Sequence, residues 1–258
     1  AGSRPAGRSA RAAAERASAL VRHAPEGTAV IPIGDENPAH RPPVVTVELI
    51  AVCALAFVAQ LTVLGGLERS VWRFGLVPAV LSGEARLTPA LAAAPAPLTL
   101  LTSMFLHGGI LHLAGNLLYL WVFGNNVEDR LGHLPYLLFY IGAGLAAAGV
   151  QIALEPDARL PMVGASGAIS GVLGAYLVLW PRARVLIFLP VLPFFLPRVR
   201  AGWLLGFWFA MQLAGAVAAP SELGGVAFGA HVGGFLAGVA VGLVLRQRPR
   251  LGPWGPRR

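Results

Sequence analysis

Six long apolar segments constrain the fold of this chain more than any other feature. They cover residues 44–65, 103–125, 134–153, 165–180, 202–218 and 227–245. A helix needs about 20 predominantly apolar residues to cross the hydrocarbon core of a bilayer, and most of the segments have about that length. Only 12% of the 258 residues are charged, whereas soluble domains average about 25%. The sequence therefore predicts an all-α, polytopic membrane protein with six transmembrane helices in one bundle.

Polar tails flank this predicted bundle on both sides. Residues 1–43 are rich in Ala, Arg, Pro and Gly and have no sustained apolar face, so we expect a disordered N-terminal tail. Residues 246–258 form an Arg-rich C-terminal tail. The six-helix domain lies between them, at residues 44–245. No cleavable signal peptide is expected, because the first apolar segment follows some forty polar residues.

Arginine placement predicts the orientation in the membrane. If the N-terminus lies inside, sixteen of the twenty arginines fall in cytoplasmic regions and four fall outside. Cytoplasmic flanks of membrane proteins carry such an excess, so both termini are expected in the cytoplasm. The net charge of +8 then needs no nucleic-acid partner. The absence of lysine, together with abundant Ala, Gly and Pro, is typical of a GC-rich genome and indicates a bacterial plasma membrane.

The sequence also allows predictions for two stretches that lie between the apolar segments. The loop at residues 66–101 is long, and loops of this length are usually functional or membrane-associated. The stretch from Val185 to Pro197 is apolar but contains three prolines. It is too short to span a bilayer, so we expect it to lie at the membrane interface.

A serine and a histidine lie within apolar segments that are expected to be embedded in the membrane. Ser166 opens the fourth segment in Gly164-Ala165-Ser166-Gly167, and His231 lies in the sixth. Polar groups at membrane depth are costly, so they are functional candidates by default. With both termini inside, the two residues lie at similar depth in the outer half of the bilayer. A serine nucleophile beside a histidine base can perform acyl transfer.

The second apolar segment supplies hydrogen-bond donors at the same depth. His112 and Asn116 are four residues apart and therefore share one helix face. Together with the backbone N–H of Ser166, they can stabilise the oxyanion that forms during acyl transfer. No carboxylate is placed to orient His231, because the acidic residues lie in tails, loops or helix ends. The pattern predicts a Ser–His dyad with no third member.

Glycines favour close approach of the helices that carry the dyad. Gly167 and Gly171 are four residues apart on the fourth segment, and Gly234 and Gly238 are four apart on the sixth. Such stripes let helix backbones pack tightly in lipid. Gly164 lies two residues before the serine and is assigned to the same helix-packing group. The alternative interpretation of these stripes is packing without any catalytic consequence.

Taken together, these residues resemble the rhomboid family of intramembrane serine proteases. The similarity rests on His107-x4-His112-x3-Asn116, on Gly164-Ala165-Ser166-Gly167, and on Ala230-His231-x2-Gly234. It extends to Gly124–Gly132 and to Phe74–Pro78, and it covers roughly residues 31–246. Each motif alone is modest, but their order on the second, fourth and sixth helices is highly specific.

The resemblance implies a serine endopeptidase that cleaves single-span membrane proteins near the outer ends of their helices. It assigns Ser166 as nucleophile and His231 as general base, with His112, Asn116 and the Ser166 amide as oxyanion donors. The fifth helix would form the moving wall of a lateral gate for transmembrane substrates. The chain departs from some family members at Ser170, where they carry an aromatic residue packed on the catalytic histidine.

Alternative functions remain open at this stage. A catalytically silent relative that binds membrane helices would usually lack the serine or the histidine. A transporter with a polar path through His112, Asn116 and His231 would often show an internal repeat, and none is apparent. A zinc protease would need a motif such as His-Glu-x-x-His, and an aspartyl protease would need two membrane-embedded aspartates. Neither pattern occurs, so no metal and no cofactor is expected.

Overall fold

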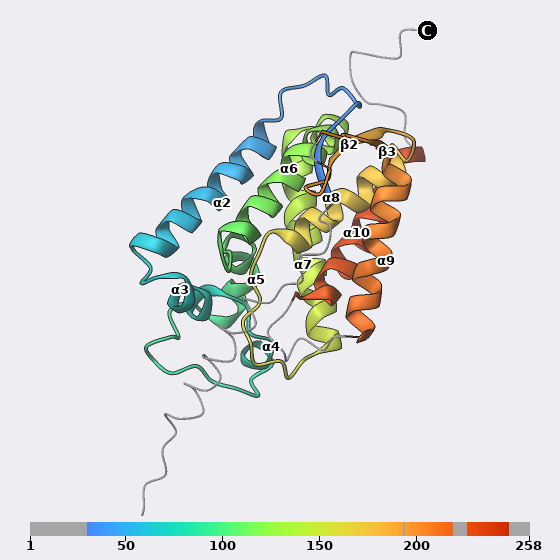
Figure 1. Ribbon diagram of the computed structural model, residues 1–258. Coiled ribbons are helices and arrows are strands. Elements are labelled where there is room, and N and C mark those ends of the chain that lie inside the picture. The colour runs from blue at the N-terminus through green and yellow to red at the C-terminus, as the bar shows by residue number, and fades with distance from the viewer. Residues whose placement is uncertain (1–29, 193, 219–225, 248–258) are drawn as a thin grey trace, which may run out of the picture.

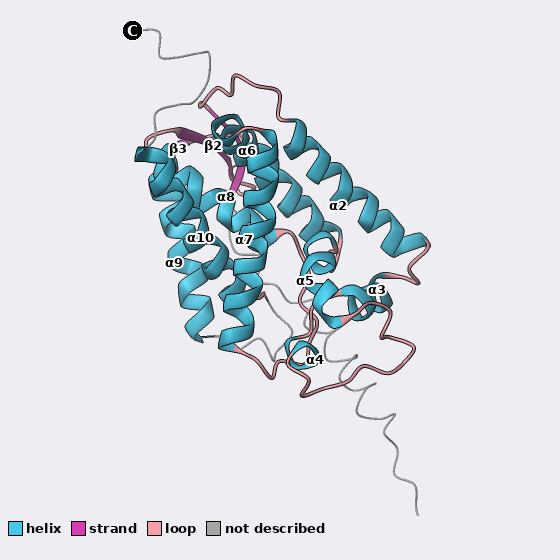
Figure 2. Ribbon diagram, turned by 180° about the vertical axis from the view of Figure 1, so that it is seen from behind, coloured by secondary structure: helices cyan, strands magenta, loops and turns pink. Residues whose placement is uncertain are grey.

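Helices dominate the computed structural model, which describes residues 30–192, 194–218 and 226–247. One main helix corresponds to each of the six apolar segments, and Figure 1 shows their arrangement from one side and Figure 2 from behind. The helices are α2 (Val44–Thr62), α6 (Ile110–Leu131), α7 (His133–Leu154), α8 (Ser166–Leu179), α9 (Ala201–Ala218) and α10 (Phe228–Gln247).

Four of these helices, α2, α7, α9 and α10, are long and apolar enough to cross a membrane. The helical stretch Ala96–Phe105 and α6 qualify together as a fifth span, with a bend of 77° between them. The remaining helix, α8, has only 14 residues and is therefore about 21 Å long at 1.5 Å per residue. All six predicted helices are present, and α8 is the shortest of them because it begins only at Ser166.

The short helix α8 is the centre of the bundle. Every residue from Ala168 to Tyr176 is buried, and α8 contacts α6, α7, α9 and α10. By contrast, α9 lies at the edge, where only Ala201 and Leu205 are buried. A helix that is apolar on all sides and surrounded by other helices does not need the length of a lipid-facing span.

Close contact between α8 and α10 depends on glycine. A Cβ atom built on Gly238 would lie 1.8 Å from the carbonyl oxygen of Gly171, and one on Gly234 would lie 2.0 Å from that of Gly167. Backbone atoms therefore fill the space that a side chain would need. The glycine stripes on the two helices face each other at the interface, as expected for small-residue packing in membranes.

The long loop before α6 contains several short helices. They are α3 (Leu67–Phe74), α4 (Pro78–Leu81) and α5 (Thr99–Thr102), with single 3-10 turns at Ala96–Leu98 and Ser103–Phe105. The loop is tied to the segment before α8, because Leu76 and Met162 exchange both backbone hydrogen bonds. This pairing holds the chain that leads into Ser166.

A small antiparallel sheet, absent from the all-α prediction, covers one end of the bundle. Its strands are β1 (Ile31–Asp35), β2 (Arg184–Phe188) and β3 (Arg198–Arg200), in the order β1-β2-β3. The expectation of disorder throughout residues 1–43 was therefore wrong for β1, whereas residues 1–29 lie outside the described residues. Val185 and Ile187 alternate with more exposed neighbours in β2, which is the period of a half-buried strand.

Asp35 connects the sheet to two of the helices through hydrogen bonds. Its Oδ2 atom accepts hydrogen bonds from the Tyr176 hydroxyl of α8 and, at 3.0 Å, from the Asn126 side-chain amide of α6. Burial raises the pKa of the Asp35 carboxyl, and these hydrogen bonds offset part of that rise. The segment that precedes the first helix is thus joined to the core by polar contacts.

A buried carboxylate caps the first helix of the bundle. The Glu128 side chain accepts hydrogen bonds from the backbone N–H groups of Val45 and Thr46, both at 2.8 Å, and from the Thr46 hydroxyl at 2.6 Å. The start of α2 has no cap from its own N-cap residue, Pro43. Glu128 therefore satisfies free N–H groups at the positive end of the helix dipole.

Replacing Glu128 by alanine is expected to destabilise the protein by about 2–4 kcal/mol, because several buried donors lose their acceptor at once. Glu128→Gln keeps one side-chain oxygen as an acceptor and is expected to lose less. Thermal unfolding in mild detergent measures both changes. An unfolding temperature for Glu128→Ala equal to that of the wild type would show that water replaces the cap.

Candidate active site

Ser166 is the first residue of α8, and the preceding turn places it there. Gly164 has a φ of +128°, a conformation that side chains with a Cβ rarely adopt. A Cβ at Gly164 would also lie 2.7 Å from Nε2 of His112. The backbone N–H of Gly164 donates to the carbonyl of Ser103 at 2.9 Å. This glycine therefore allows both the turn and the close approach of His112.

The structure brings Ser166 and His231 together. Nε2 of His231 lies 2.7 Å from Oγ of Ser166, which is hydrogen-bond distance. The serine comes from the first turn of α8 and the histidine from the first turn of α10. Both residues are half-buried. The glycine contacts between these two helices permit this distance, since they bring the two backbones together.

Two side chains of α9 hold the imidazole of His231. Oε1 of Gln212 lies 2.8 Å from Nδ1, and the ring of Trp208 packs with its centroid 5.8 Å from that of the imidazole. Neither contact was predicted from the sequence. One signal was present, because Gln212 is the only amide side chain of the apolar helix α9, and polar residues within apolar spans are functional candidates.

The two expected oxyanion donors both lie in α6, and His112 approaches the turn that precedes Ser166. Nδ2 of Asn116 is buried and has no hydrogen-bond partner within the described part of the chain. His112 is exposed, and its Nδ1 accepts the backbone N–H of Gly108 at 3.4 Å. A neutral ring that accepts at Nδ1 carries its proton on Nε2, the nitrogen that faces Gly164.

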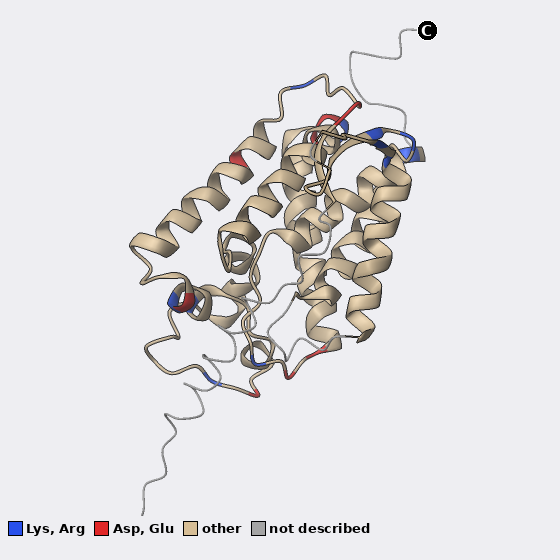
Figure 3. Cartoon of the chain, in the orientation of Figure 1, with Lys and Arg blue, Asp and Glu red and all other residues tan. Residues whose placement is uncertain are grey.

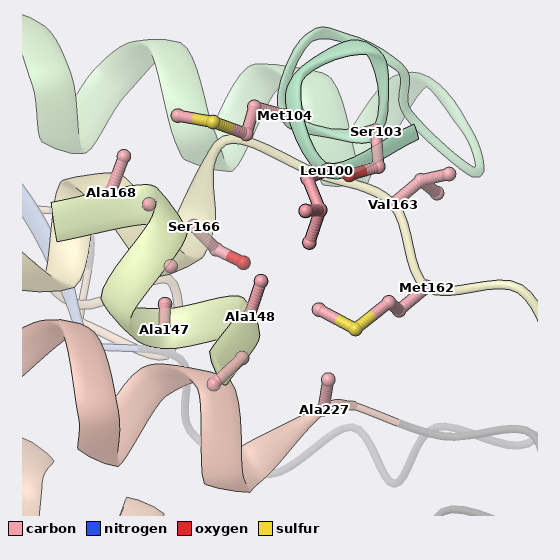
Figure 4. A pocket seen from close by; sticks show the side chains of 14 residues that line it. Leu100, Ser103, Met104, Ala147, Ala148, Met162, Val163, Ser166, Ala168 and Ala227 are labelled. Carbon is pink, nitrogen blue, oxygen red and sulfur yellow. The ribbon is translucent and has the colours of Figure 1, made fainter. Parts of the chain in front are cut away.

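A small cavity of about 30 Å³ adjoins Ser166, large enough for a water molecule. Figure 4 shows the Ser166 hydroxyl directed into the space between Leu100, Ala148 and Met162. The cavity walls are formed mostly by small or apolar residues. Within residues 30–192, 194–218 and 226–247, no three His, Cys, Asp or Glu side chains are grouped so that they could hold a metal ion.

This arrangement contains the parts needed for covalent hydrolysis. A hydroxyl lies at hydrogen-bond distance from one histidine nitrogen, and an amide oxygen lies at hydrogen-bond distance from the other. In addition, α6 carries a buried amide donor, Nδ2 of Asn116, that has no partner in the described part of the chain. In a neutral imidazole whose Nδ1–H donates to Gln212, the Nε2 lone pair is free to accept the serine proton.

Comparison with known sequences gives one family. The sequence model of the Rhomboid domain matches residues 95–248, a range that includes every candidate site residue described above.

Similar curated proteins come from distant organisms. Rhomboid protease GluP of Bacillus subtilis is 35% identical over 158 residues, which are 61% of this chain and 28% of that protein. Rhomboid protein 1, mitochondrial, of Saccharomyces cerevisiae is 30% identical over 165 residues, or 59% of this chain and 44% of that protein. RHOMBOID-like protein 5 of Arabidopsis thaliana is 31% identical over 172 residues, or 61% and 47%. The matched region thus spans less than half of each of these relatives.

Proposed function

Since this chain belongs to the rhomboid family and is a multi-pass integral membrane protein, we propose that it is an intramembrane serine endopeptidase. Its substrates are single-span membrane proteins, cleaved near the outer ends of their transmembrane helices. Ser166 is the nucleophile and His231 is the general base. The relative named as a protease supports the class of reaction.

One observation carries this proposal, the 2.7 Å contact between Nε2 of His231 and Oγ of Ser166. Serine and histidine at the ends of two separate helices gain little for packing from such a contact in an apolar bundle. A base within hydrogen-bond distance of a hydroxyl is what activates a serine nucleophile. The half-exposure of both residues leaves access for the water that hydrolysis consumes.

The reaction follows from these positions. As Oγ attacks the scissile carbonyl, its proton passes to Nε2 of His231, which then gives that proton to the departing amine. The acyl group stays on Ser166 as an ester. A water molecule, deprotonated by the same nitrogen, releases the second product. Each proton leaves and returns through one imidazole nitrogen, so no metal is needed for this route.

The oxyanion of the tetrahedral intermediate needs hydrogen-bond donors that have no other partner before the substrate binds. Nδ2 of Asn116 fits this role because it is buried without a partner, a costly state unless a ligand or water satisfies it. His112 presents an N–H on Nε2, and the backbone N–H of Ser166 is one of the free donors at the start of α8. We assign these groups to the oxyanion hole.

Replacing Asn116 by alanine is expected to lower kcat by about 10²–10³-fold, the usual loss for one oxyanion donor. The KM should change little, because the donor acts mainly after the attack on the carbonyl. Initial-rate kinetics with a transmembrane substrate in liposomes separate the two constants. A variant with the wild-type kcat would exclude Asn116 from the oxyanion hole.

The orientation proposed for the molecule has both termini in the cytoplasm, and the membrane is the bacterial plasma membrane. Figure 3 supports it, since arginines gather at the end of the bundle that carries β2 and β3. The folded domain is proposed to begin with β1 and to include the six helices up to residue 245, followed by the Arg-rich tail.

The experiment that tests the function uses the wild-type protein reconstituted in liposomes with a single-span reporter. Cleavage near the outer end of the reporter helix, together with a fluorophosphonate adduct mapped to Ser166 by mass spectrometry, is the expected result. A folded protein that binds the reporter, cuts nothing and takes no adduct would instead favour the silent helix-binding alternative.

A further inference from the structure

We propose that Gln212 is the positioning residue of the catalytic histidine, and that it sets which imidazole nitrogen carries the proton. This inference rests on the proposed roles of Ser166 and His231. The sequence offered no carboxylate to act as a third member of the site. The described part of the chain likewise places no carboxylate in an ion pair with His231, and an amide from α9 occupies that place.

The hydrogen bonds on the two ring nitrogens determine the tautomer. Oε1 of Gln212 is an acceptor only, so at 2.8 Å it fixes the proton of a neutral ring on Nδ1. Nε2 then carries the lone pair, 2.7 Å from Oγ of Ser166. The opposite tautomer would place an N–H against the serine hydroxyl and leave no base there. Gln212 therefore holds the ring in the form that can accept a proton.

Trp208 supplies the second restraint from the same helix. It lies four residues before Gln212, on the same face of α9, and its ring is tilted by 34° against the imidazole. Ser170 has no aromatic ring to offer, and its hydroxyl donates to the Ser166 carbonyl at 2.6 Å. The support of the histidine thus comes from α9 and not from α8.

The test compares Gln212→Leu with Gln212→Glu by two readouts, the kcat and KM for a transmembrane reporter and the rate of fluorophosphonate labelling at Ser166. Gln212→Leu is expected to lower kcat and the labelling rate by about 10- to 100-fold, which is part of the 10²–10⁴-fold that a general base contributes. The KM should stay unchanged. Gln212→Glu keeps an acceptor oxygen and is expected to restore both rates to within a few-fold of wild type.

Met211→Leu is the matched control, because this neighbouring side chain is exposed on α9. It should leave both rates and the unfolding temperature unchanged. A Gln212→Leu protein that reacts as fast as wild type, or a Gln212→Glu protein that stays as slow as the leucine variant, would overturn the positioning role while leaving the protease intact. A folded wild type that neither cleaves nor takes the label would overturn the proposed function, and this role with it.

A separate feature at the opposite end of α9 is a hollow lined by arginines. Pro181, Arg182, Arg200, Gly202 and Trp203 enclose about 290 Å³, and we call this the arginine hollow. It lies between the end of α8 and the start of α9, beside the sheet. In Figure 3 the basic residues gather at this end of the molecule.

Among the described residues, most of the positive charge in and beside the arginine hollow has no acidic partner. Arg184 and Arg200 are direct partners in the register of β2 and β3, and like charges placed opposite each other destabilise a strand pair. Arg198 is paired with Glu36 at 2.6 Å. Within the described ranges, no carboxylate forms an ion pair with Arg182, Arg184 or Arg200.

The surroundings of the hollow belong to the membrane interface. Trp203, at the start of a span, is 76% exposed, and tryptophan favours the head-group level of a bilayer. The chain between β2 and β3 exposes large apolar side chains, at Val191, Leu192, Phe194 and Phe195. With these apolar side chains in the bilayer, the arginines at the base of the segment would lie at the depth of lipid phosphates.

We propose that the arginine hollow binds the phosphate of an anionic phospholipid from the cytoplasmic leaflet. Guanidinium groups bind phosphate oxygens through paired, charge-assisted hydrogen bonds. Basic pockets beside membrane helices on the cytoplasmic side are known places for anionic head groups. A lipid seated there would also relieve the repulsion between Arg184 and Arg200.

Native mass spectrometry of the protein, released from nanodiscs of phosphatidylcholine with added phosphatidylglycerol, tests this proposal. The wild type should retain phosphatidylglycerol in preference to phosphatidylcholine. The double variant Arg182→Gln/Arg200→Gln should bind it about 25-fold more weakly, at about fivefold for each arginine. Arg246→Gln is the control, since this exposed arginine lies in the last turn of α10 and does not line the hollow.

Three results would overturn the lipid site. They are equal retention by the double variant and the wild type, an equal loss with Arg246→Gln, and displacement of the lipid by millimolar inorganic phosphate. The first two would mean that general surface charge attracts the lipid. The third would mean that the hollow is a site for free phosphate.

Discussion

Ser166→Ala is expected to abolish cleavage of a transmembrane reporter, with a loss of more than about 10⁴-fold in kcat. The hydroxyl removed is the one that lies 2.7 Å from the imidazole, and no covalent intermediate can form without it. The fold should survive, because the change deletes one half-exposed oxygen atom. Reporter cleavage and circular dichroism on the same preparation measure the two effects.

Ser170→Ala is the matched control for this prediction. Ser170 is the only other serine of α8, lies one turn deeper, and is 1% exposed. Its hydroxyl donates to the carbonyl of Ser166 and not to a base, so its loss should leave most of the activity. A protein that loses activity with Ser170→Ala but keeps it with Ser166→Ala would reverse the assignment of the nucleophile.

The two serines show how the same residue type serves opposite purposes within one helix. Ser170 satisfies itself against its own backbone, a common habit of serine in helices. Ser166 cannot do so, because no residue of α8 precedes it to offer a carbonyl. Its hydroxyl is therefore left for a partner from another helix, and that partner is His231.

The family and the helical fold were predictable from the sequence, and both predictions are confirmed. The motifs around Asn116, Ser166 and His231 are local, so they can be read without knowledge of the packing. Five of the six apolar segments marked their helices to within about three residues, whereas the second segment, 103–125, began and ended earlier in the chain than α6 (Ile110–Leu131) does. The catalytic roles stay predictions, although the structure places Ser166 and His231 in contact.

Contacts between distant parts of the chain were beyond the sequence patterns. Glu128 caps α2, more than 80 residues earlier in the chain, and no local pattern predicts such a contact. The contact between Gln212 and His231 depends on which face of α9 points toward the histidine. Because α9 is apolar on all sides, its sequence does not indicate that orientation. β1 was not predicted, because a strand of only five residues that includes a proline carries too little signal in the sequence.

The length of α8 was predicted to within one residue at each end, but its burial at the centre of the bundle was not predicted. Apolar composition alone cannot separate a helix that crosses lipid from one buried among other helices. Here α8 stops at Leu179 and starts at Ser166, so its first turn opens inside the protein. That short length brings free N–H groups and the serine to the depth at which His231 begins its own helix.

Gly238→Ala is expected to prevent normal assembly of the bundle. The added methyl carbon would lie 1.8 Å from the carbonyl oxygen of Gly171 and 2.6 Å from its carbonyl carbon, so α8 and α10 would have to separate. Ordinary overpacking costs about 1–3 kcal/mol. The backbone cannot rotate away as a side chain can. We therefore expect Gly238→Ala to lower the free energy of unfolding by more than about 3 kcal/mol, which corresponds to a fall in unfolding temperature of about 10 °C.

The dyad makes this loss of packing visible in activity as well, since Ser166 and His231 meet only while α8 and α10 stay close. Gly142→Ala in α7 is the control, because a Cβ there meets no atom within 4 Å, and alanine favours a helix over glycine. Gly142→Ala should leave the cleavage rate equal to that of the wild type, and it should leave the unfolding temperature unchanged or raise it slightly. If Gly238→Ala were as stable and as active as Gly142→Ala, the close approach of the two backbones would not be what holds the dyad together.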